Sequence, residues 1–327
     1  MRFVLRRLGF FVVTLWAAIT VNFFIPRLMP GNPAEAMMSR YHGHINPQAL
    51  HALEVAFGVK THQSLLSEYF DYLGNVFRGR FGTSLTFFPD PVMHNILQAL
   101  PWTLVLVGVT TIVGFVLGTL IGLIGAWRRG GFLDGALPPI FIITSAFPYF
   151  WLAILSIWLF SLKLGWLPQS GGYDVIDTPS WTWHFAHDAF VHSILPALTI
   201  LVTAIGGWIL TMRNNTISVL TEDYVRMARA KGLAPHRIMW SYAGRNAILP
   251  NLTGFAMSLG FVVAGAILVE FVFNYPGVGW MFLQSVENQD YALMQGLFLM
   301  IVVAVLTAIL AVDAATVMLD PRTRDVR

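Results

Sequence analysis

The chain has 327 residues, of which 56% are hydrophobic and only 11% are charged. Soluble domains average about a quarter charged residues, so this composition indicates an integral membrane protein. The net charge of +3 is small, and no nucleic-acid partner is expected. The chain has no cysteine, which excludes disulfides, thiolate catalysis and cysteine-ligated metals.

The N-terminal segment, residues 1–28, combines basic residues with a long apolar run. Arg2, Arg6 and Arg7 precede an uncharged stretch that continues to Pro26. This run is long for a signal peptide and no small-residue cleavage site follows it. The segment is therefore predicted to be a cytoplasmic N-terminus followed by an uncleaved first transmembrane helix. Residues 29–94 are then expected to form an extracytoplasmic segment.

The second expected span covers residues 103–127, after a break at Pro101. Gly114, Gly118 and Gly122 recur at intervals of four and so share one helix face. Small residues at this spacing allow two membrane helices to approach closely. Four more spans are expected at 137–162, 194–212, 252–269 and 292–312, with prolines tolerated inside them. Together these predict an all-α integral membrane protein with six transmembrane helices.

The longest polar interval between two spans in the C-terminal half comprises residues 213–251, here called the polar loop. It is predicted to form two short helices joined by a hinge. Glu222 and Arg226 stand four apart, as on an exposed helix face. Gly232 is free to turn left-handed, which is how helices commonly end. Pro235 suits the first turn of a second helix.

The distribution of positive charge predicts the orientation of the chain. With six spans, both termini lie on the same side, and 14 of the 20 Lys and Arg residues fall in segments on that side. The positive-inside rule then places both termini and the polar loop in the cytoplasm. The 14 Lys and Arg residues on the cytoplasmic side are Arg2, Arg6, Arg7, Arg128, Arg129, Arg213, Arg226, Arg229, Lys231, Arg237, Arg245, Arg322, Arg324 and Arg327.

One motif in the polar loop is specific enough to suggest a family. Ala228, Ala230 and Gly232 are followed, about seventeen residues on, by Ile248, Leu249 and Pro250. This pattern resembles the EAA loop of permease subunits in binding-protein-dependent ABC importers. The run DYVRMARAKG is similar to the B-type subunit of the oligopeptide, dipeptide and nickel branch. Further matches extend along the chain: 57–59, Tyr69, Leu73, Gly79, Gly82, Ser84, 192–198, 269–273, 276–279, 290–291 and 320–322.

The resemblance implies a type I ABC importer permease fold, the MetI-like fold, with a permease core at 95–318 and a cytoplasmic tail at 319–327. It implies that the polar loop holds a cytoplasmic coupling helix seated in a groove of an ATPase subunit. The residues implied to couple to the ATPase are Glu222, Asp223, Arg226, Ala228, Ala230, Lys231, Gly232 and Pro250. The sequence departs from the family's usual pattern at Asn32 and Arg80, where an acidic residue is usual.

The resemblance also implies partners and a location. The expected partners are a homologous second permease in a heterodimer, two ATP-binding subunits or domains, an extracytoplasmic substrate-binding protein and the lipid of a bacterial inner membrane. The chain would form half of a pathway that moves di- and oligopeptides by alternating access. Oligosaccharides and nickel chelates are alternative cargoes for the same machinery.

The sequence offers little chemistry of its own. It lacks the glycine-rich phosphate loop of ATPases, so no ATP hydrolysis and no cofactor are expected of this chain. Glu270 and Asp313 are candidate structural or transport acids near span ends. Five loop histidines invite a metal interpretation, but their spacing is a weak signal and no metal site is predicted; they are His42, His44, His184, His187 and His192.

Three other interpretations remain open from the residues. The polar loop is also compatible with an amphipathic helix lying on the membrane surface. The whole chain is also compatible with a stand-alone channel or secondary transporter, which would need no ATPase. A membrane-embedded enzyme is the least favoured, because the spans hold no cluster of acid, base and nucleophile.

Overall fold

The computed structural model describes residues 2–28 and 64–319. Within these ranges the chain is built from helices and loops, with one isolated antiparallel bridge between Thr83 and Pro91. Contacts divide the chain into two compact units. Unit 1 comprises 1–103, 263–267 and 276–311, and unit 2 comprises 104–262, 268–275 and 312–327. The expected features at Asn32, His42, His44 and the 320–327 tail lie outside the described residues.

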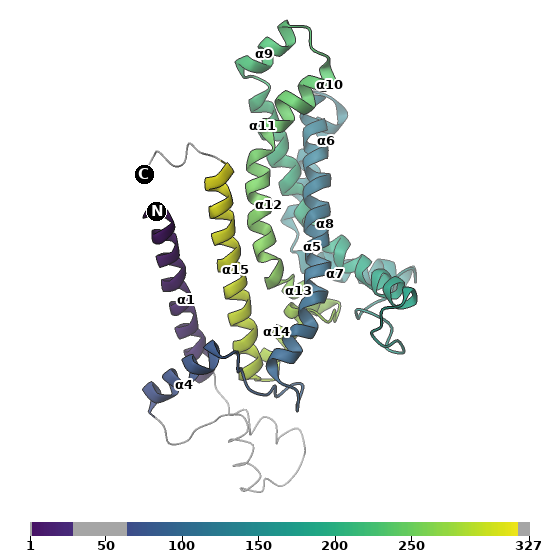
Figure 1. The fold of residues 1–327 in the computed structure, drawn as a ribbon. Coiled ribbons are helices and arrows are strands. Elements are labelled where there is room, and N and C mark those ends of the chain that lie inside the picture. The colour runs from purple at the N-terminus through teal and green to yellow at the C-terminus, as the bar shows by residue number, and fades with distance from the viewer. Residues whose placement is uncertain (1, 29–63, 320–327) are drawn as a thin grey trace. The chain divides into compact units, whose positions relative to one another are not determined.

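Unit 1 contains α1 (Arg2–Leu28), α4 (Leu65–Phe77), the start of α5 (Val92–Trp127), α14 (Val278–Glu287) and most of α15 (Tyr291–Leu319). Unit 2 contains the rest of α5, followed by α6 (Phe132–Ala146), α7 (Tyr149–Ser156), the π-helix η1 (Ile157–Lys163) and the long helix α8 (Trp183–Val219). Four short elements come next: α9 (Asp223–Ala230), α10 (Pro235–Arg237), the π-helix η2 (Ile238–Gly244) and α11 (Arg245–Ala247). The unit ends with α12 (Leu249–Phe261) and most of α13 (Ile267–Val272). The short 3₁₀ helix η3 (Val262–Ala264) falls at the division. Figure 1 labels most of these elements.

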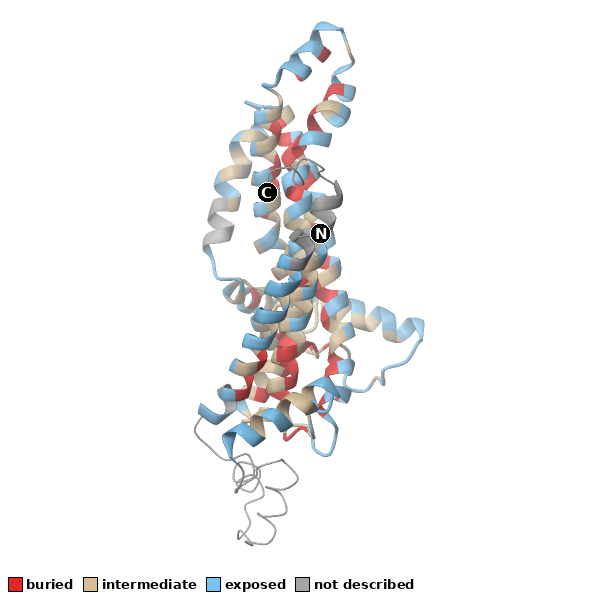
Figure 2. Ribbon diagram, turned by 60° about the vertical axis from the view of Figure 1, so that its left-hand side comes forward, coloured by how far each residue is buried: buried red, intermediate tan, exposed pale blue. Residues whose placement is uncertain are grey.

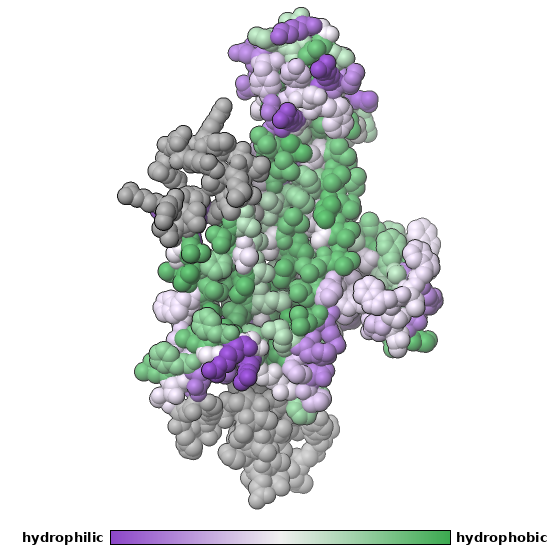
Figure 3. Space-filling model, in the orientation of Figure 1, coloured by the Kyte–Doolittle hydropathy of each residue, from purple (hydrophilic) through white to green (hydrophobic). Residues whose placement is uncertain are grey.

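Among the described residues, four helices are long and apolar enough to cross a membrane. These stretches are Arg6–Ile25, Val92–Trp127, Trp183–Val219 and Tyr291–Ala311. Two further segments, Pro235–Ala247 and Leu249–Ala264, would form another span if counted together, with a bend of 50° between them. Large apolar side chains are exposed along these helices (green in Figure 3), as expected for surfaces in contact with lipid.

In unit 1, α1 is joined to α15 by a reciprocal pair of hydrogen bonds. The Asn22 side-chain amide donates to the Gln295 carbonyl oxygen at 2.9 Å, and the Gln295 side chain donates to the Asn22 carbonyl oxygen at 3.0 Å. Asn22 is only 1% exposed. Polar side chains that bond across apolar helices in this way hold them in one register.

A buried carboxylate orders the other end of unit 1. Asp290 precedes α15, and its side chain accepts hydrogen bonds from the backbone N–H groups of Leu293 at 3.0 Å and Thr86 at 2.8 Å. The Ser84 hydroxyl donates to the same carboxylate. Asp290 thus caps α15 and fixes the hairpin before α5 to it. Close by, an apolar core forms from Val92, Ile96, Ala99, Val278, Met281, Leu293 and Leu297.

In unit 2, α5 packs closely on α8 along the predicted glycine face. A Cβ atom added at Gly118 would lie 2.5 Å from the Trp208 Cβ, and one added at Gly122 would lie 2.5 Å from the Ile209 carbonyl oxygen. Neither position has room for any side chain. The prediction that small residues allow a close helix approach is confirmed, and the contact is buried (red in Figure 2).

Two proline predictions are wrong. Pro101 does not break the second span, because α5 continues through it from Val92. The nearby Thr103 hydroxyl accepts a hydrogen bond from the Val278 N–H at 2.8 Å. Pro148 does interrupt the expected 137–162 span. The residue before a proline is disfavoured in helical conformation, and Phe147 is extended, so α6 ends at Ala146 and α7 begins at Tyr149.

The expected fifth span is also interrupted, and it ends in a buried acid. The helix α12 gives way to η3 and then to Gly265, which has φ +72°. Glu270 lies in α13 with 0% exposure, so this candidate acid is buried and does not form a solvated span end. The backbone closes around it, since the Tyr275 N–H donates to the Glu270 carbonyl oxygen at 2.8 Å.

Candidate functional site

The first residues of the polar loop, 213–219, belong to the end of α8, and the two predicted helical segments follow as α9 and α10. Glu222 has extended backbone and is the N-cap of α9. Gly232 follows the helix with φ +73°, a conformation that costs other residues about 1 kcal/mol or more. Pro235 then occupies the first turn of α10. The predicted hinge at Gly232 is confirmed.

One face of α9 is anchored to the body of unit 2. Val225 and Ala228 are 0% and 3% exposed and pack against Ile238 of η2. Several partly buried side chains complete this cluster: Trp127, Val219, Leu220, Leu233 and Tyr242. A polar tie adds to it, because the Asn246 side-chain amide donates to the Tyr224 hydroxyl at 2.9 Å. The helix is therefore held against η2 and α11.

The opposite face of α9 is open. Met227 is 58% exposed and Tyr224 is 39% exposed, and Arg226, Arg229 and Lys231 are exposed around them. Figure 2 shows α9 mostly exposed, and in Figure 3 this end of unit 2 is predominantly hydrophilic. Arg226 faces Asp223 at 3.6 Å, whereas the sequence spacing had suggested Glu222 as its neighbour.

The C-terminal side of the polar loop enters α12 through a bend. Pro250 is in the first turn of α12, where a missing N–H costs no helix hydrogen bond. Next to it, Asn251 is 1% exposed, and its side-chain amide donates to the Thr119 hydroxyl of α5 and the Trp208 carbonyl oxygen of α8, both at 3.2 Å. Asn251 thus locks α12 to two apolar helices. Sequence reasoning missed it, although a lone amide at the edge of an apolar span is a usable signal.

An ion pair fixes the N-terminal side of the polar loop. The Arg213 Nε–H donates a hydrogen bond to the Asp134 carboxylate at 2.7 Å. The Arg213 Nη2 atom lies 2.6 Å from the same carboxylate oxygen. The other carboxylate oxygen accepts the Gly130 N–H at 2.9 Å. The Gly130 N–H and, after it, Arg213 hold the pKa of Asp134 below its usual value. Neither residue was paired from the sequence, because they are 79 positions apart.

Taken together, these contacts make the polar loop a stiff extension of α5, α8 and α12. Its exposed face offers a methionine, a tyrosine and basic side chains, and it contains no arrangement of acid, base and nucleophile.

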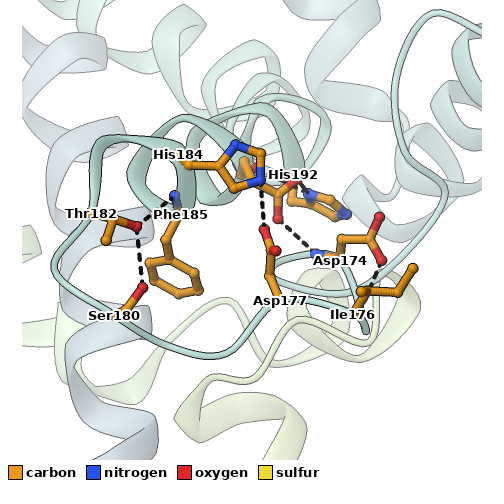
Figure 4. A network of polar contacts seen from close by, with 9 residues as sticks. Asp174, Ile176, Asp177, Ser180, Thr182, His184, Phe185 and His192 are labelled. Atoms are coloured by element: carbon orange, nitrogen blue, oxygen red, sulfur yellow. Dashed lines mark hydrogen bonds and ion pairs between the residues drawn. The ribbon is translucent and has the colours of Figure 1, made fainter.

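The remaining candidate residues lie elsewhere. Glu270 is buried in α13, and Asp313 belongs to α15 by its backbone. His184 and His192, expected in a loop, lie in the first turns of α8. Both face carboxylates (Figure 4): His184 lies 3.3 Å from Asp177, and His192 lies 3.2 Å from Asp188. Among the described residues, no group of three or more His, Cys, Asp and Glu side chains is placed to hold a metal ion.

Comparison with known proteins identifies the family. Residues 118–325 match the family described as the binding-protein-dependent transport system inner membrane component, and residues 1–107 match the N-terminal family of the same systems' membrane components. The matched regions include the whole polar loop and most of both units. The chain belongs to this family. It is a permease subunit of an ABC transport system, and subunits of this kind are not themselves enzymes.

Individual relatives match the permease from end to end. It is 34% identical over 340 residues to the di/tripeptide transport system permease protein DppB of Pseudomonas aeruginosa, with 99% of each chain covered. It is 30% identical to the dipeptide transport system permease protein DppB of Lactococcus lactis, with 99% of each covered. It is also 30% identical to the oligopeptide transport system permease protein AppB of Bacillus subtilis, with 98% of each covered.

Proposed function

We propose that this permease forms half of the translocation pathway of an ATP-driven importer for di- and oligopeptides. The observation that carries the proposal is the polar loop, a rigid helical element with an open face, in a chain that matches peptide permeases along its full length. A homologous second permease would supply the other half, and a binding protein would deliver the peptide. Partner subunits would hydrolyse the ATP.

In this proposal α9 is the coupling helix. Its open face, with Tyr224 and Met227, would sit in a groove of the ATPase subunit, and Glu222, Asp223, Arg226 and Lys231 would border the contact. The buried face with Val225 and Ala228 would pass movement of the ATPase to η2 and α12. A rigid connection of this kind can bias a helix bundle between two arrangements, which is what alternating access requires.

The proposed topology has six spans with both termini in the cytoplasm of a bacterial inner membrane. The third span is assigned to α6 with α7 and η1, which Pro148 interrupts, and the fifth to α12 with η3, the part of the bent segment that follows the polar loop. The support is the concentration of basic residues in the polar loop and at the chain ends. Glu270 is proposed to be a structural acid, because it is fully buried beside Tyr275.

The cargo is proposed from the relatives, whose names specify dipeptides, tripeptides and oligopeptides. Oligosaccharides and nickel chelates remain alternative cargoes of the same machinery, to be distinguished by uptake competition. The alternative of another class is a stand-alone carrier or channel.

The test is gentle affinity purification of the full chain from its own membranes, followed by reconstitution into liposomes. A second permease and ATP-binding subunits should copurify, and uptake of a labelled dipeptide should require ATP and the binding protein. Uptake of the dipeptide by this chain alone, without ATP, would overturn the proposal in favour of a carrier.

A further inference from the structure

The helix α4 divides into three faces. Successive residues of an α-helix are about 100° apart, so Leu66, Phe70 and Phe77 fall within about 40° of one another. These three side chains are 71%, 66% and 82% exposed. A polar flank, centred about 120° away around the helix, consists of Ser67, Asp71 and Asn75, which are also exposed. The third face, between these flanks, is in contact with α1.

The contacts between α4 and α1 lie near the C-terminal end of the apolar stretch of α1. Tyr69 shares a 2.7 Å hydrogen bond with Thr20, and the Asn22 side-chain amide donates to the Tyr72 hydroxyl at 3.0 Å. Arg27 pairs with Glu68 at 3.0 Å. Because the apolar stretch of α1 runs from Arg6 to Ile25, these contacts hold α4 at one end of a membrane span. Figure 1 shows α4 crossing α1 there.

Two observations indicate what covers the apolar flank. First, a series of aromatic ring contacts leads from α1 to that flank. The ring centroids of Phe24 and Phe23 are 5.2 Å apart, those of Phe23 and Tyr69 are 5.2 Å apart, and those of Tyr69 and Phe70 are 6.0 Å apart. Phe24 itself is 45% exposed on α1, while Phe23 between them is buried, so the ring contacts pack the base of the apolar flank against a helix with exposed apolar side chains.

Second, the apolar flank ends next to basic side chains. Arg78 and Arg80 follow Phe77 directly and are exposed. A phospholipid surface offers hydrocarbon for the apolar side chains and phosphate oxygens for the guanidinium groups at neighbouring depths. An aqueous surface would leave the three large apolar side chains hydrated.

We propose that α4 is an interfacial helix, which lies in the headgroup region of the membrane with Leu66, Phe70 and Phe77 inserted among the lipid chains and Ser67, Asp71 and Asn75 facing water. The partner is the phospholipid surface itself. The helix then fixes the depth of α1 from outside the bundle. This assignment rests on α1 being a membrane span and is independent of cargo and of the ATPase.

The absence of cysteine from the chain makes a direct test practicable. Single-cysteine variants F70C and F77C, with S67C and N75C as matched controls on the polar flank, are labelled with a nitroxide. The full chain is reconstituted into phosphatidylcholine vesicles. Collision of the spin label with oxygen, which enriches in lipid, is compared with collision with a water-soluble nickel chelate.

The expected result is an oxygen preference at positions 70 and 77 that is several-fold higher than at 67 and 75, with and without added phosphatidylglycerol. Equal exposure of all four labels to the nickel chelate would overturn the proposal. Shielding of positions 70 and 77 from both reagents would also overturn it, because the flank would then be covered by protein. Because the readout involves neither ATP nor peptide, its failure is distinct from failure of the transport proposal.

Discussion

At the scale of single residues, the contacts that hold the polar loop in place come from polar side chains at helix ends. The side chains of Asp134 and Arg213 are 10% and 19% exposed. Two nitrogens of the Arg213 guanidinium contact one oxygen of the Asp134 carboxylate. An exposed ion pair contributes little, but a partly buried, two-fold hydrogen-bonded pair contributes more. Asp223 and Arg226, at 97% and 68% exposure, provide a natural comparison within the same unit.

The first prediction compares these two pairs. Asp134→Asn should lower the free energy of unfolding by about 1–2 kcal/mol, because the charge is lost while Arg213 stays partly buried. Asp223→Asn should change it by less than about 0.5 kcal/mol. The measurement is denaturation of the purified protein in mixed detergent. Equal effects of the two substitutions would show that the Asp134 pair does not stabilise unit 2.

The pH dependence has a defined sign. The Gly130 N–H and Arg213 lower the pKa of Asp134 in the folded protein, so its stabilisation is complete above the ordinary carboxyl value of about 4. It is lost as the pH falls through the lowered folded value. The stability difference between wild type and Asp134→Asn should therefore be constant near neutral pH and shrink only in acid. A difference that changed between pH 6 and 8 would point to another group.

At the scale of helices, the close packing of α5 on α8 depends on glycines, which have no side chain to keep the helices apart. Gly118 and Gly122 leave no space between α5 and α8, whereas a Cβ atom at Gly207 of α8 would meet nothing within 4 Å. The two kinds of glycine cannot be told apart by residue type. The regular spacing of Gly114, Gly118 and Gly122 is what made their role predictable.

The second prediction uses this contrast. Gly118→Ala should destabilise the protein by about 1–3 kcal/mol, because α5 and α8 must separate to admit the new atom. Gly207→Ala should be neutral or slightly stabilising, since alanine is the better helix former. Thermal unfolding of both purified variants in one detergent gives the comparison. If Gly118→Ala and Gly207→Ala unfolded at the same temperature, α5 and α8 would not be in the close contact described.

The third prediction concerns the hinge after α9. Gly232→Pro should abolish peptide uptake while ATP hydrolysis by the complex continues, because proline cannot adopt a φ of +73°. Glu222→Arg should act in the same direction by reversing the charge at the N-cap. Gly232→Asn is the control, since asparagine tolerates a left-handed conformation. Uptake and ATPase rates are measured on the same proteoliposomes. Normal uptake in both Gly232→Pro and Glu222→Arg would remove α9 from the coupling path.

At the scale of the whole molecule, the sequence predicted most of the long helices and the helical hairpin of the polar loop. Apolar runs and charge gaps are properties of consecutive residues, so they can be read directly. Pro101 and Pro148 show the limit, because one lies inside a helix and the other separates two. Both prolines lie in apolar runs, so residue type alone does not distinguish them. The Asp290 contacts with Ser84 and Thr86 were unpredictable because they join residues 206 and 204 positions apart.

The fourth prediction concerns orientation. In a chain without native cysteine, Ser180→Cys should react with a membrane-impermeant maleimide on intact cells, and Ser218→Cys should react only after permeabilisation. Both side chains are exposed in the structure, so accessibility reports the side of the membrane. The reverse labelling pattern would place the polar loop outside and exclude contact with a cytoplasmic ATPase.

The reciprocal bonds between Asn22 and Gln295 have a consequence for biosynthesis. The two residues are 273 positions apart, so the ribosome delivers α1 to the bilayer long before α15 exists. During that interval the Asn22 amide has no access to the Gln295 carbonyl. Until then the Asn22 amide can donate only to the Tyr72 hydroxyl of α4, which follows 50 positions later. Completion of the last helix supplies the second partner, so the register between α1 and α15 is set only at the end of synthesis.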